Sequence, residues 1–292
     1  MKTQSIPALT PEPIVQDRVI ANFPKRPRDS HKGMFGSVAV IGGASGMIGA
    51  PLLAARAALK LGAGCVHVGL LTDNAPGVDP LQPELMLHPA ANALLLPNLN
   101  VLAIGCGMGT SKAAYKLLYE TLKFKTPIVL DADALNLLAR HADLQDDLRA
   151  RNHPSVLTPH PGEAARLLAC EIGEVQADRV TAVRQLAQKF ACSVVLKGAS
   201  SLCATRDGRL FVNQTGNPGM SAAGMGDVLT GMIAAFIAQG MTADDALLLA
   251  VHLHGAAGDA LAEQQATIGM TATEVTEWAR WLLNRHTIRM AS

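Results

Sequence analysis

A polar, glycine-rich segment in the C-terminal third of the chain holds residue types suited to phosphoryl chemistry. It runs from Asn213 to Asp227 and leads directly into a predicted amphipathic helix, Val228–Gln239. Gly224, Gly226 and Asp227 would lie at the N-terminus of that helix, where free backbone N–H groups and the helix dipole attract an anion. Asp227 then has two interpretations. It is either a helix N-cap, for which Asp is a preferred residue, or a base facing a phosphate held by the glycines.

Two further glycine loops follow short apolar segments. Gly42–Gly46 follows Ser37–Ile41, and Gly105–Gly109 follows Val101–Ile104. Both place flexible backbone at the carboxyl end of an expected strand, where ligands bind in open α/β sheets. Neither loop has the Gly-Lys-Ser/Thr ending of a Walker A loop or the glycine spacing of a dinucleotide-binding fingerprint. Each is therefore either a tight turn or a ligand cradle.

Acidic and histidine side chains follow other expected strands. Asp131 and Asp133 come directly after Pro127–Leu130, so a Mg²⁺ site or a water network is open to them, while Asp133 could instead cap the next helix. Glu163 begins a predicted helix, where an acidic residue suits the dipole, and it is a second candidate contact for a metal or its waters. His160 lies between two prolines, and both a structural and a ligand-binding role are open to it.

The elements that must position these residues alternate along the chain. Six short runs rich in Val, Ile and Leu are typical of strands buried on both faces: Ser37–Ile41, Cys65–Leu71, Val101–Ile104, Pro127–Leu130, Ser155–Thr158 and Ser193–Leu196. Helical segments lie between them: Gly49–Lys60, Ser111–Lys123, Glu163–Ala169 and Arg179–Phe190. This alternation predicts repeated βαβ units and a doubly wound sheet. An antiparallel hairpin is expected around the Asp207-Gly208 turn, and residues 227–284 are expected to be mostly helical.

The composition fits one enzyme-sized domain. The 292 residues are 49% hydrophobic and 17% charged, which provides ample apolar surface for a core. A formal net charge of +1 gives no electrostatic reason to expect a nucleic-acid partner. We expect a single catalytic domain over residues 31–285. A proline-rich leader over residues 1–30 is expected to pack on that domain or on a neighbouring subunit.

Cysteine usage and hydropathy favour a reducing compartment. Five cysteines, an odd number without a Cys-x-x-Cys pair, argue against a disulfide framework and against a cysteine zinc site. His252 and His254 are two apart in a predicted helix, so they do not share a face as zinc ligands would, and we expect them to pack. The first thirty residues lack the apolar core of a signal peptide, and no run of about 18 apolar residues occurs. A cytoplasmic location is therefore expected.

The Gly-x-Gly-Asp run at residues 224–227 resembles the signature of ribokinase-like kinases. The resemblance implies an α/β, ribokinase-like fold with a doubly wound, mostly parallel central sheet flanked by helices. In that superfamily the glycines form an anion hole for the transferring phosphoryl group, and the Asp accepts the proton of the attacking hydroxyl. Phosphoryl transfer requires such positioning and charge stabilisation. The resemblance therefore favours the base over the cap for Asp227, with Gly224 and Gly226 as the anion hole.

Further segments, from about His31 to Val275, are similar to the NAD(P)H-hydrate dehydratase family. They are His31–Gly36 (HKGMFG), Gly49–Ala58 (GAPLLAARAA), Leu130–Leu135 (LDADAL), Leu157–Glu163 (LTPHPGE), Leu196–Ala199 (LKGA) and Asn217–Met220 (NPGM). The Thr-Pro-His-Pro-Gly-Glu run combined with the later Gly-Met-Gly-Asp is a specific pairing. Two departures are mild: Met225 stands where a smaller residue is usual, and Ser201 where Thr is common. Either could alter the grip on the nucleotide without changing the reaction.

The family resemblance implies a role for each matched position. Nucleotide contacts would come from Gly226 and from the loop after the sixth expected strand: Lys197, Gly198, Ala199, Ser200 and Ser201. The hydrated nicotinamide cofactor would contact Ala50, Gly107, His160 and the base Asp227. Asp131 and Glu163 stay as the candidate metal contacts.

The implied reaction restores NADH and NADPH from their hydrates, (S)-NADHX and (S)-NADPHX. ADP phosphorylates the hydroxyl of the hydrated ring, phosphate is then lost, and AMP is released. Mg²⁺ would neutralise charge, and the epimerase activity found in some relatives would reside in another protein. A homo-oligomer, a tetramer, is expected. Two alternatives stay open: an ATP-dependent small-molecule kinase of the same superfamily, such as a hydroxyethylthiazole or sugar kinase, and a non-catalytic nucleotide-sensing module, for which a base would have no use.

Overall fold

A computed structural model of the chain describes residues 10–265 and 267–289. The first nine residues of the expected leader lie outside this description. Within the described residues, no helix is both long enough and apolar enough to cross a membrane.

The described residues form one sheet whose strands match the predicted apolar runs closely. Its strands are β1 (Glu12–Pro13), β2 (Ser37–Gly42), β3 (Cys65–Leu70), β4 (Met86–Pro89), β5 (Val101–Ile104), β6 (Ile128–Leu130), β7 (Ser155–Leu157), β8 (Ser193–Leu196), β9 (Leu202–Ala204) and β10 (Leu210–Val212). The spatial order is β1-β10-β9-β8-β7-β6-β5-β2-β3-β4. Only β9 runs antiparallel to its neighbours among these strands. The predicted mostly parallel, doubly wound sheet and the hairpin at Asp207-Gly208 are confirmed.

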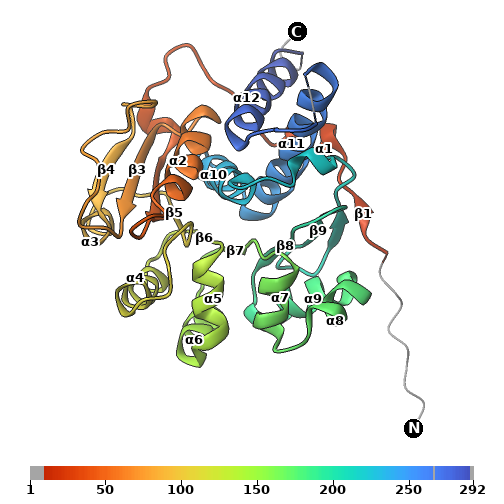
Figure 1. The fold of residues 1–292 in the computed structure, drawn as a ribbon. Coiled ribbons are helices and arrows are strands. Elements are labelled where there is room, and N and C mark those ends of the chain that lie inside the picture. The colour runs from red at the N-terminus through yellow and green to blue at the C-terminus, as the bar shows by residue number, and fades with distance from the viewer. Residues whose placement is uncertain (1–9, 266, 290–292) are drawn as a thin grey trace.

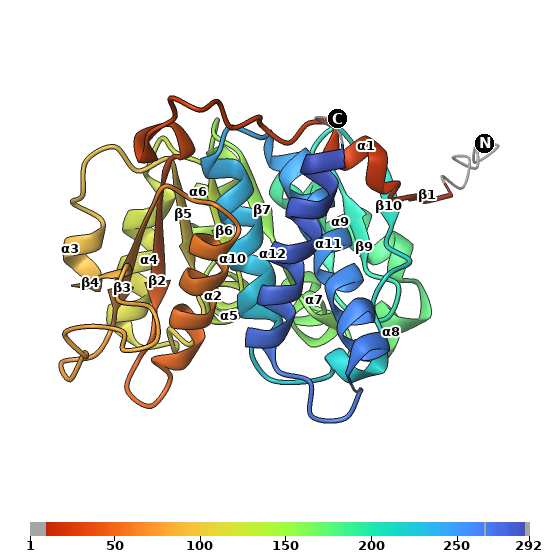
Figure 2. The ribbon, with the colours of Figure 1, turned by 90° about the horizontal axis from the view of Figure 1, so that it is seen from above.

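Helices cover both faces of the sheet (Figure 1). One face carries α1 (Gln16–Ile20), α2 (Gly49–Lys60), α10 (Met225–Ala238), α11 (Ala243–Gln264) and α12 (Ala272–Arg289), which lie in front of the strands in Figure 2. The other face carries α3 (Ala90–Ala93), α4 (Lys112–Leu122), α5 (Asp133–Arg140), α6 (Ala142–Ala150), α7 (Pro161–Leu168), α8 (Ile172–Ala177) and α9 (Arg179–Phe190). The helical C-terminal part is thus confirmed.

The central strands lack a polar face because each one is buried on both sides. On β2, Val38 and Val40 pack into the core beneath α2 and α10, while Ala39 and Ile41 pack into the core on the opposite face. Successive strand residues point to opposite faces, so a central strand between two helical layers needs apolar residues at every position. This explains why the predicted runs showed no alternation.

Short elements escaped the sequence analysis. The edge strand β4 reads Met-Leu-His-Pro and lacks the Val and Ile content of the central strands, and α6 and α8 were not predicted. The predicted helix Glu163–Ala169 begins two residues earlier, at Pro161, because His160 caps it and Pro is favoured in the first helical turn. These differences leave the carboxyl ends of β2, β5, β6, β7 and β8 where the candidate residues were expected.

Candidate active site

The glycine-rich segment ends at the N-terminus of α10. Gly224 is the N-cap and has φ +87°, a left-handed conformation that favours glycine, and a Cβ atom there would lie 2.5 Å from Leu53 Cδ1. Asp227 is the third residue of the helix, and α10 has no side-chain cap hydrogen bond. The N-cap interpretation of Asp227 is therefore wrong. Its carboxylate lies in the first turn, where the helix dipole favours negative charge, without serving as the cap.

Asp227 lies in a cluster of acidic groups at the ends of β5 and β6. The Cys106 sulfur and one carboxylate oxygen each from Asp131 and Asp227 all lie within 4.8 Å of one another. Burial, and then the neighbouring Asp131 charge, raise the pKa of Asp227 to about 6, although a hydrogen bond from Cys106 and the charge of Lys197 oppose the shift. The carboxylate is therefore mostly ionised at neutral pH and more basic than an exposed aspartate, as a general base requires.

A buried ion pair anchors this cluster. Lys197 Nζ lies 2.7 Å from Asp131 Oδ1, and the Thr230 hydroxyl donates to Asp131 Oδ2 at 3.0 Å. Burial opposes ionisation of Asp131, but the Lys197 ammonium outweighs it and lowers the pKa of that carboxyl. A Cβ atom at Gly226 would lie 3.1 Å from Lys197 Nζ. Lys197, which follows β8, and Gly226 of α10 are both predicted to contact the nucleotide, and they are thus neighbours.

The loop after β8 owes its shape to a residue that sequence analysis missed. Arg179, at the start of α9, donates to the carbonyl oxygens of Leu196 and Lys197 at 3.2 and 3.3 Å and also to that of Ala199. The Ser201 hydroxyl donates to the Gly198 carbonyl at 3.0 Å. Gly198, Ala199 and Ser200 consequently lie exposed at the surface. No sequence motif marks Arg179, because its partners are backbone atoms 17 to 20 residues away.

The two other glycine loops lie against each other. Gly43 N donates to Cys106 O at 3.1 Å, and Ala44 N donates to Gly107 O at 2.7 Å. Gly107 has φ +57°, and a Cβ atom there would lie 3.1 Å from the Ala50 Cβ. Ala50 and Gly107, both predicted to contact substrate, are therefore neighbours although 57 residues separate them.

Strained backbone follows β6. Ala132 has φ +50° and ψ −113°, which is uncommon for a residue with a side chain. In this conformation the carboxylates of Asp131 and Asp133, on either side of Ala132, point to different partners. Asp131 reaches Lys197, whereas Asp133 Oδ2 accepts a hydrogen bond from Gly109 N at 2.8 Å. Asp133 thus supports a glycine loop, a role that neither of its predicted interpretations included.

His160 and Glu163 form a capping box at the start of α7. Gly162 N donates to His160 Nδ1 at 3.0 Å, and His160 N donates to Glu163 Oε2 at 2.8 Å. Glu163 is 5% exposed and lies 3.9 Å from Lys197 Nζ, and burial raises its pKa to about 7. The His160 ring remains about half exposed, so it keeps a free face for a ligand.

The donor set fits Mg²⁺ only in part. Both oxygens of Asp131 already accept hydrogen bonds from Lys197 and Thr230, so this carboxylate is poorly suited to bind a metal directly. Glu163 is buried with a raised pKa, and a nearby cation would stabilise its ionised form. Mg²⁺ usually keeps several waters and binds phosphate oxygens, which fits contact with Glu163 through water.

His252 and His254 both lie in α11 and pack against other parts of the chain, as expected. His252 Nε2 lies 3.3 Å from Gln16 Oε1 of α1. Burial and then the charge of Lys197 lower the pKa of His254 to about 4, so its ring is neutral. His254 therefore lies close to the site, and its buried Nε2 has no hydrogen-bond partner among the described residues.

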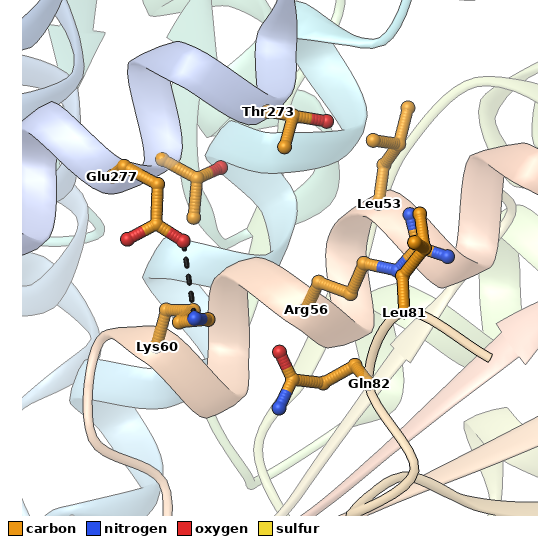
Figure 3. A pocket seen from close by; sticks show the side chains of 8 residues that line it. Leu53, Arg56, Lys60, Leu81, Gln82, Thr273 and Glu277 are labelled. Atoms are coloured by element: carbon orange, nitrogen blue, oxygen red, sulfur yellow. Dashed lines mark ion pairs between the residues drawn. The ribbon is translucent and has the colours of Figure 1, made fainter. Parts of the chain in front are cut away.

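A small cavity of about 110 Å³ lies beside α2, outside this cluster (Figure 3). It is lined by residues of α2, α12 and the loop after β3: Leu53, Arg56, Lys60, Leu81, Gln82, Thr273, Thr276 and Glu277. Its charged groups are paired, since Lys60 Nζ lies 3.1 Å from Glu277 Oε1 and Arg56 Nη2 lies 2.7 Å from Asp79 Oδ1. The cavity borders the helix that supports Gly224 and contains none of the candidate catalytic groups.

The strand order, the glycine-lined start of α10 and the buried Lys197–Asp131 pair define a ribokinase-like protein. The chain belongs to the NAD(P)H-hydrate dehydratase family, whose sequence profile matches residues 38–280. It is 45% identical over 272 residues to an ADP-dependent (S)-NAD(P)H-hydrate dehydratase of Neisseria meningitidis, covering 92% of each chain.

Other similar proteins include a longer relative and two solved structures. The chain is 39% identical to a bifunctional NAD(P)H-hydrate repair enzyme of Escherichia coli, but it spans only 50% of that protein. The crystal structure of an ADP/ATP-dependent NAD(P)H-hydrate dehydratase from Bacillus subtilis, co-crystallised with ATP and Mg²⁺, superposes with a TM-score of 0.85 at 29% identity, covering 95% of this chain and 99% of that one. A hydroxyethylthiazole kinase from Pyrococcus horikoshii reaches a TM-score of 0.60 at 19% identity, a likeness of fold alone.

Proposed function

We propose that this chain dehydrates (S)-NADHX and (S)-NADPHX at the expense of ADP, with Asp227 as the general base. The observation that carries the assignment of the base is the position of Asp227. Its partly buried carboxylate, with a pKa raised to about 6, stands in the first turn of α10 beside Gly226 and within the same cluster as Asp131. The family relationship supports the substrate.

The chain's own groups suit each part of the reaction. Asp227 accepts the proton of the ring hydroxyl. The oxygen of that hydroxyl attacks the β-phosphorus of ADP, and AMP leaves. Backbone N–H groups at Gly224 and Gly226 and the Lys197 ammonium stabilise the charge on the transferring phosphoryl group. The phosphorylated oxygen then departs as phosphate while the enamine nitrogen of the ring supplies electrons, and loss of a proton from the adjacent ring carbon restores the dihydropyridine.

Two loops would hold the substrates. The loop from Lys197 to Ser201, shaped by Arg179, would contact the nucleotide. Ala50 and Gly107 line one boundary for the hydrated cofactor, and the exposed His160 ring provides a polar contact. Bound Mg²⁺ would neutralise phosphate charge, with Glu163 as the contact to its waters.

The direct test is recovery of the dihydropyridine. The protein is incubated with NADHX or NADPHX, Mg²⁺ and ADP, ATP or no nucleotide, and the absorbance of the restored ring is followed. With ADP we expect one AMP and one phosphate for each NADH. If no nucleotide supports recovery and a thiazole alcohol or sugar is phosphorylated by ATP instead, the small-molecule kinase is the correct interpretation. Nucleotide binding without turnover of any of these substrates would favour a sensing module.

A bifunctional NAD(P)H-hydrate repair enzyme occurs among the relatives, in E. coli, and we propose that this chain acts alongside an NAD(P)HX epimerase. Adding a purified NAD(P)HX epimerase to a mixture of hydrate epimers should raise the final yield of NADH. The yield should rise from about the fraction of S epimer in the mixture to complete conversion of both epimers. An unchanged yield would contradict this division of labour.

A further inference from the structure

Cys106 lies at the centre of the site but has no part in the chemistry described above. It follows β5, is fully buried and carries a free thiol. Its carbonyl oxygen accepts a hydrogen bond from Gly43 N at 3.1 Å, and a side chain at Gly42 would overlap that same oxygen. The backbone of Cys106 is therefore held by the two facing glycine loops, which leaves its side chain little freedom to move.

The thiol points toward the proposed base. Its sulfur lies within 4.8 Å of a carboxylate oxygen of Asp227 and of one from Asp131, so the thiol is in the immediate surroundings of both carboxylates. The two carboxylates differ in their other partners. Asp131 is satisfied by Lys197 and Thr230, at 2.7 and 3.0 Å. For Asp227, the polar neighbour in this cluster that can donate and carries no charge is the Cys106 thiol.

We propose that Cys106 is a positioning residue for the base: its thiol donates to one oxygen of Asp227 and so aims the other oxygen at the substrate hydroxyl. This inference rests on the proposed function of Asp227. The terminal torsion of an aspartate is broad, so a carboxylate without a partner samples many orientations, whereas a fixed donor selects one of them. Proton abstraction depends on such geometry, because the base must lie within hydrogen-bond reach of its proton.

The chemistry of sulfur suits this role. A thiol is a weak donor, so it orients the carboxylate while withdrawing little of its basicity, whereas an ammonium or guanidinium donor would strongly stabilise the ionised form. Burial, followed by the charges of Asp227 and Asp131, raises the pKa of Cys106, so the thiol keeps its proton. The hydroxyl proton therefore passes to Asp227 and not to the thiol, Asp227 releases it to solvent before the next turnover, and the thiol is unchanged after each turnover.

The test compares Cys106→Ala with Cys106→Ser. Both variants shorten the side chain and open similar space, but only serine restores a donor. We expect Cys106→Ala to lower kcat for NADHX dehydration at least about tenfold with the nucleotide KM changed less than about twofold. Cys106→Ser should recover kcat to within about threefold of the unmodified protein. Cys192→Ala is the matched control, because Cys192 is equally buried but belongs to the opposite core, and its kcat should not change.

The outcomes separate this inference from the proposed function. An unmodified protein that fails to dehydrate NADHX defeats the proposed function. An active protein whose Cys106→Ala variant keeps its kcat, or whose Ala and Ser variants are equally impaired, overturns the role of the thiol alone. If Cys106→Ala does not fold, as judged by its melting transition, Cys106→Val replaces it, because valine fills the volume without a donor.

Discussion

At the scale of single residues, the site holds the charged groups of Lys197, Asp131 and Asp227 close together, and Lys197 forms an ion pair with Asp131. Lys197 lies 2.7 Å from Asp131 and lowers the pKa of that carboxyl, whereas burial and then the Asp131 charge raise the pKa of Asp227 to about 6. Like charges in one buried site push their pKa values apart, and the higher one belongs to the better base. Of these two carboxylates, Asp227 is therefore the one suited to act as the proposed base.

Asp227→Asn should remove activity while leaving the fold and nucleotide binding intact. The amide keeps the shape of the side chain but cannot accept the hydroxyl proton, and loss of a general base typically lowers the rate by about 10² to 10⁴. The measurements are kcat with NADHX, the nucleotide Kd and the melting temperature. Asp143→Asn is the control, since Asp143 is an exposed acidic residue in the first turn of α6. Turnover within about threefold of the unmodified protein would remove Asp227 from the mechanism.

The pH dependence should report the same residue. Because Asp227 must be ionised to accept a proton and its pKa is raised to about 6, kcat/KM for the hydrate should be constant above that pH and fall about tenfold per unit below it. The measurement is a kcat/KM profile with the hydrate well below its KM. An exposed aspartate would show no such fall above pH 5, so a flat profile from pH 8 to 5 would contradict the buried base.

At the scale of elements, the proposed nucleotide-binding loop is held by a neighbouring helix. Arg179 at the start of α9 donates hydrogen bonds to three carbonyl groups of the segment Leu196–Ala199. The glycine at 198, with φ +132°, adds conformational freedom that this arginine restrains. The shape of the proposed nucleotide-binding loop therefore depends on Arg179, which lies 17 or more residues before it in the sequence.

Arg179→Leu should raise the nucleotide KM about tenfold with a smaller change in kcat. Hydrogen bonds from a charged donor contribute about 1.5–3 kcal/mol each, and about 1.4 kcal/mol corresponds to a factor of ten in affinity. Steady-state kinetics with ADP varied at saturating NADHX measures both constants. Arg184→Leu, on the same helix, should leave them unchanged, and equal effects of the two substitutions would argue that Arg179 acts only through general stability.

At the scale of the whole molecule, several large apolar side chains lie exposed on the surface. Leu81 is 74% exposed and Trp281 is 45% exposed. A groove of about 1180 Å³ runs between the N-terminal residues, including Phe23 and Pro24, and α12. Exposed apolar surface rimmed by polar residues marks interaction sites in soluble proteins.

We expect the protein to be a homotetramer in solution. Association of subunits would bury the exposed apolar side chains of the leader and of the C-terminal helices. Light scattering coupled to size-exclusion chromatography, at micromolar concentration, should give about four times the mass of one chain. A monomeric mass under these conditions would contradict the prediction.

The sequence by itself determined the class of fold and the family, and it gave the residues that are proposed to react. Buried parallel strands need apolar residues at every position, and a glycine-rich segment before a helix needs residues without side chains, so both leave local patterns that survive in the sequence. Segments such as Leu157–Glu163 and Gly224–Asp227 could therefore be matched to a family without any knowledge of the fold.

Only the tertiary structure decided how those groups are tuned. Asp131 and Lys197 are 66 residues apart, and Cys106 and Asp227 are farther apart still, so no local pattern predicts their contact. The same holds for Asp227 as a member of the first turn rather than the cap, which depends on the left-handed conformation of Gly224 against Leu53. A pKa responds to burial and to neighbouring charges within a few ångströms, and both are properties of the packed molecule.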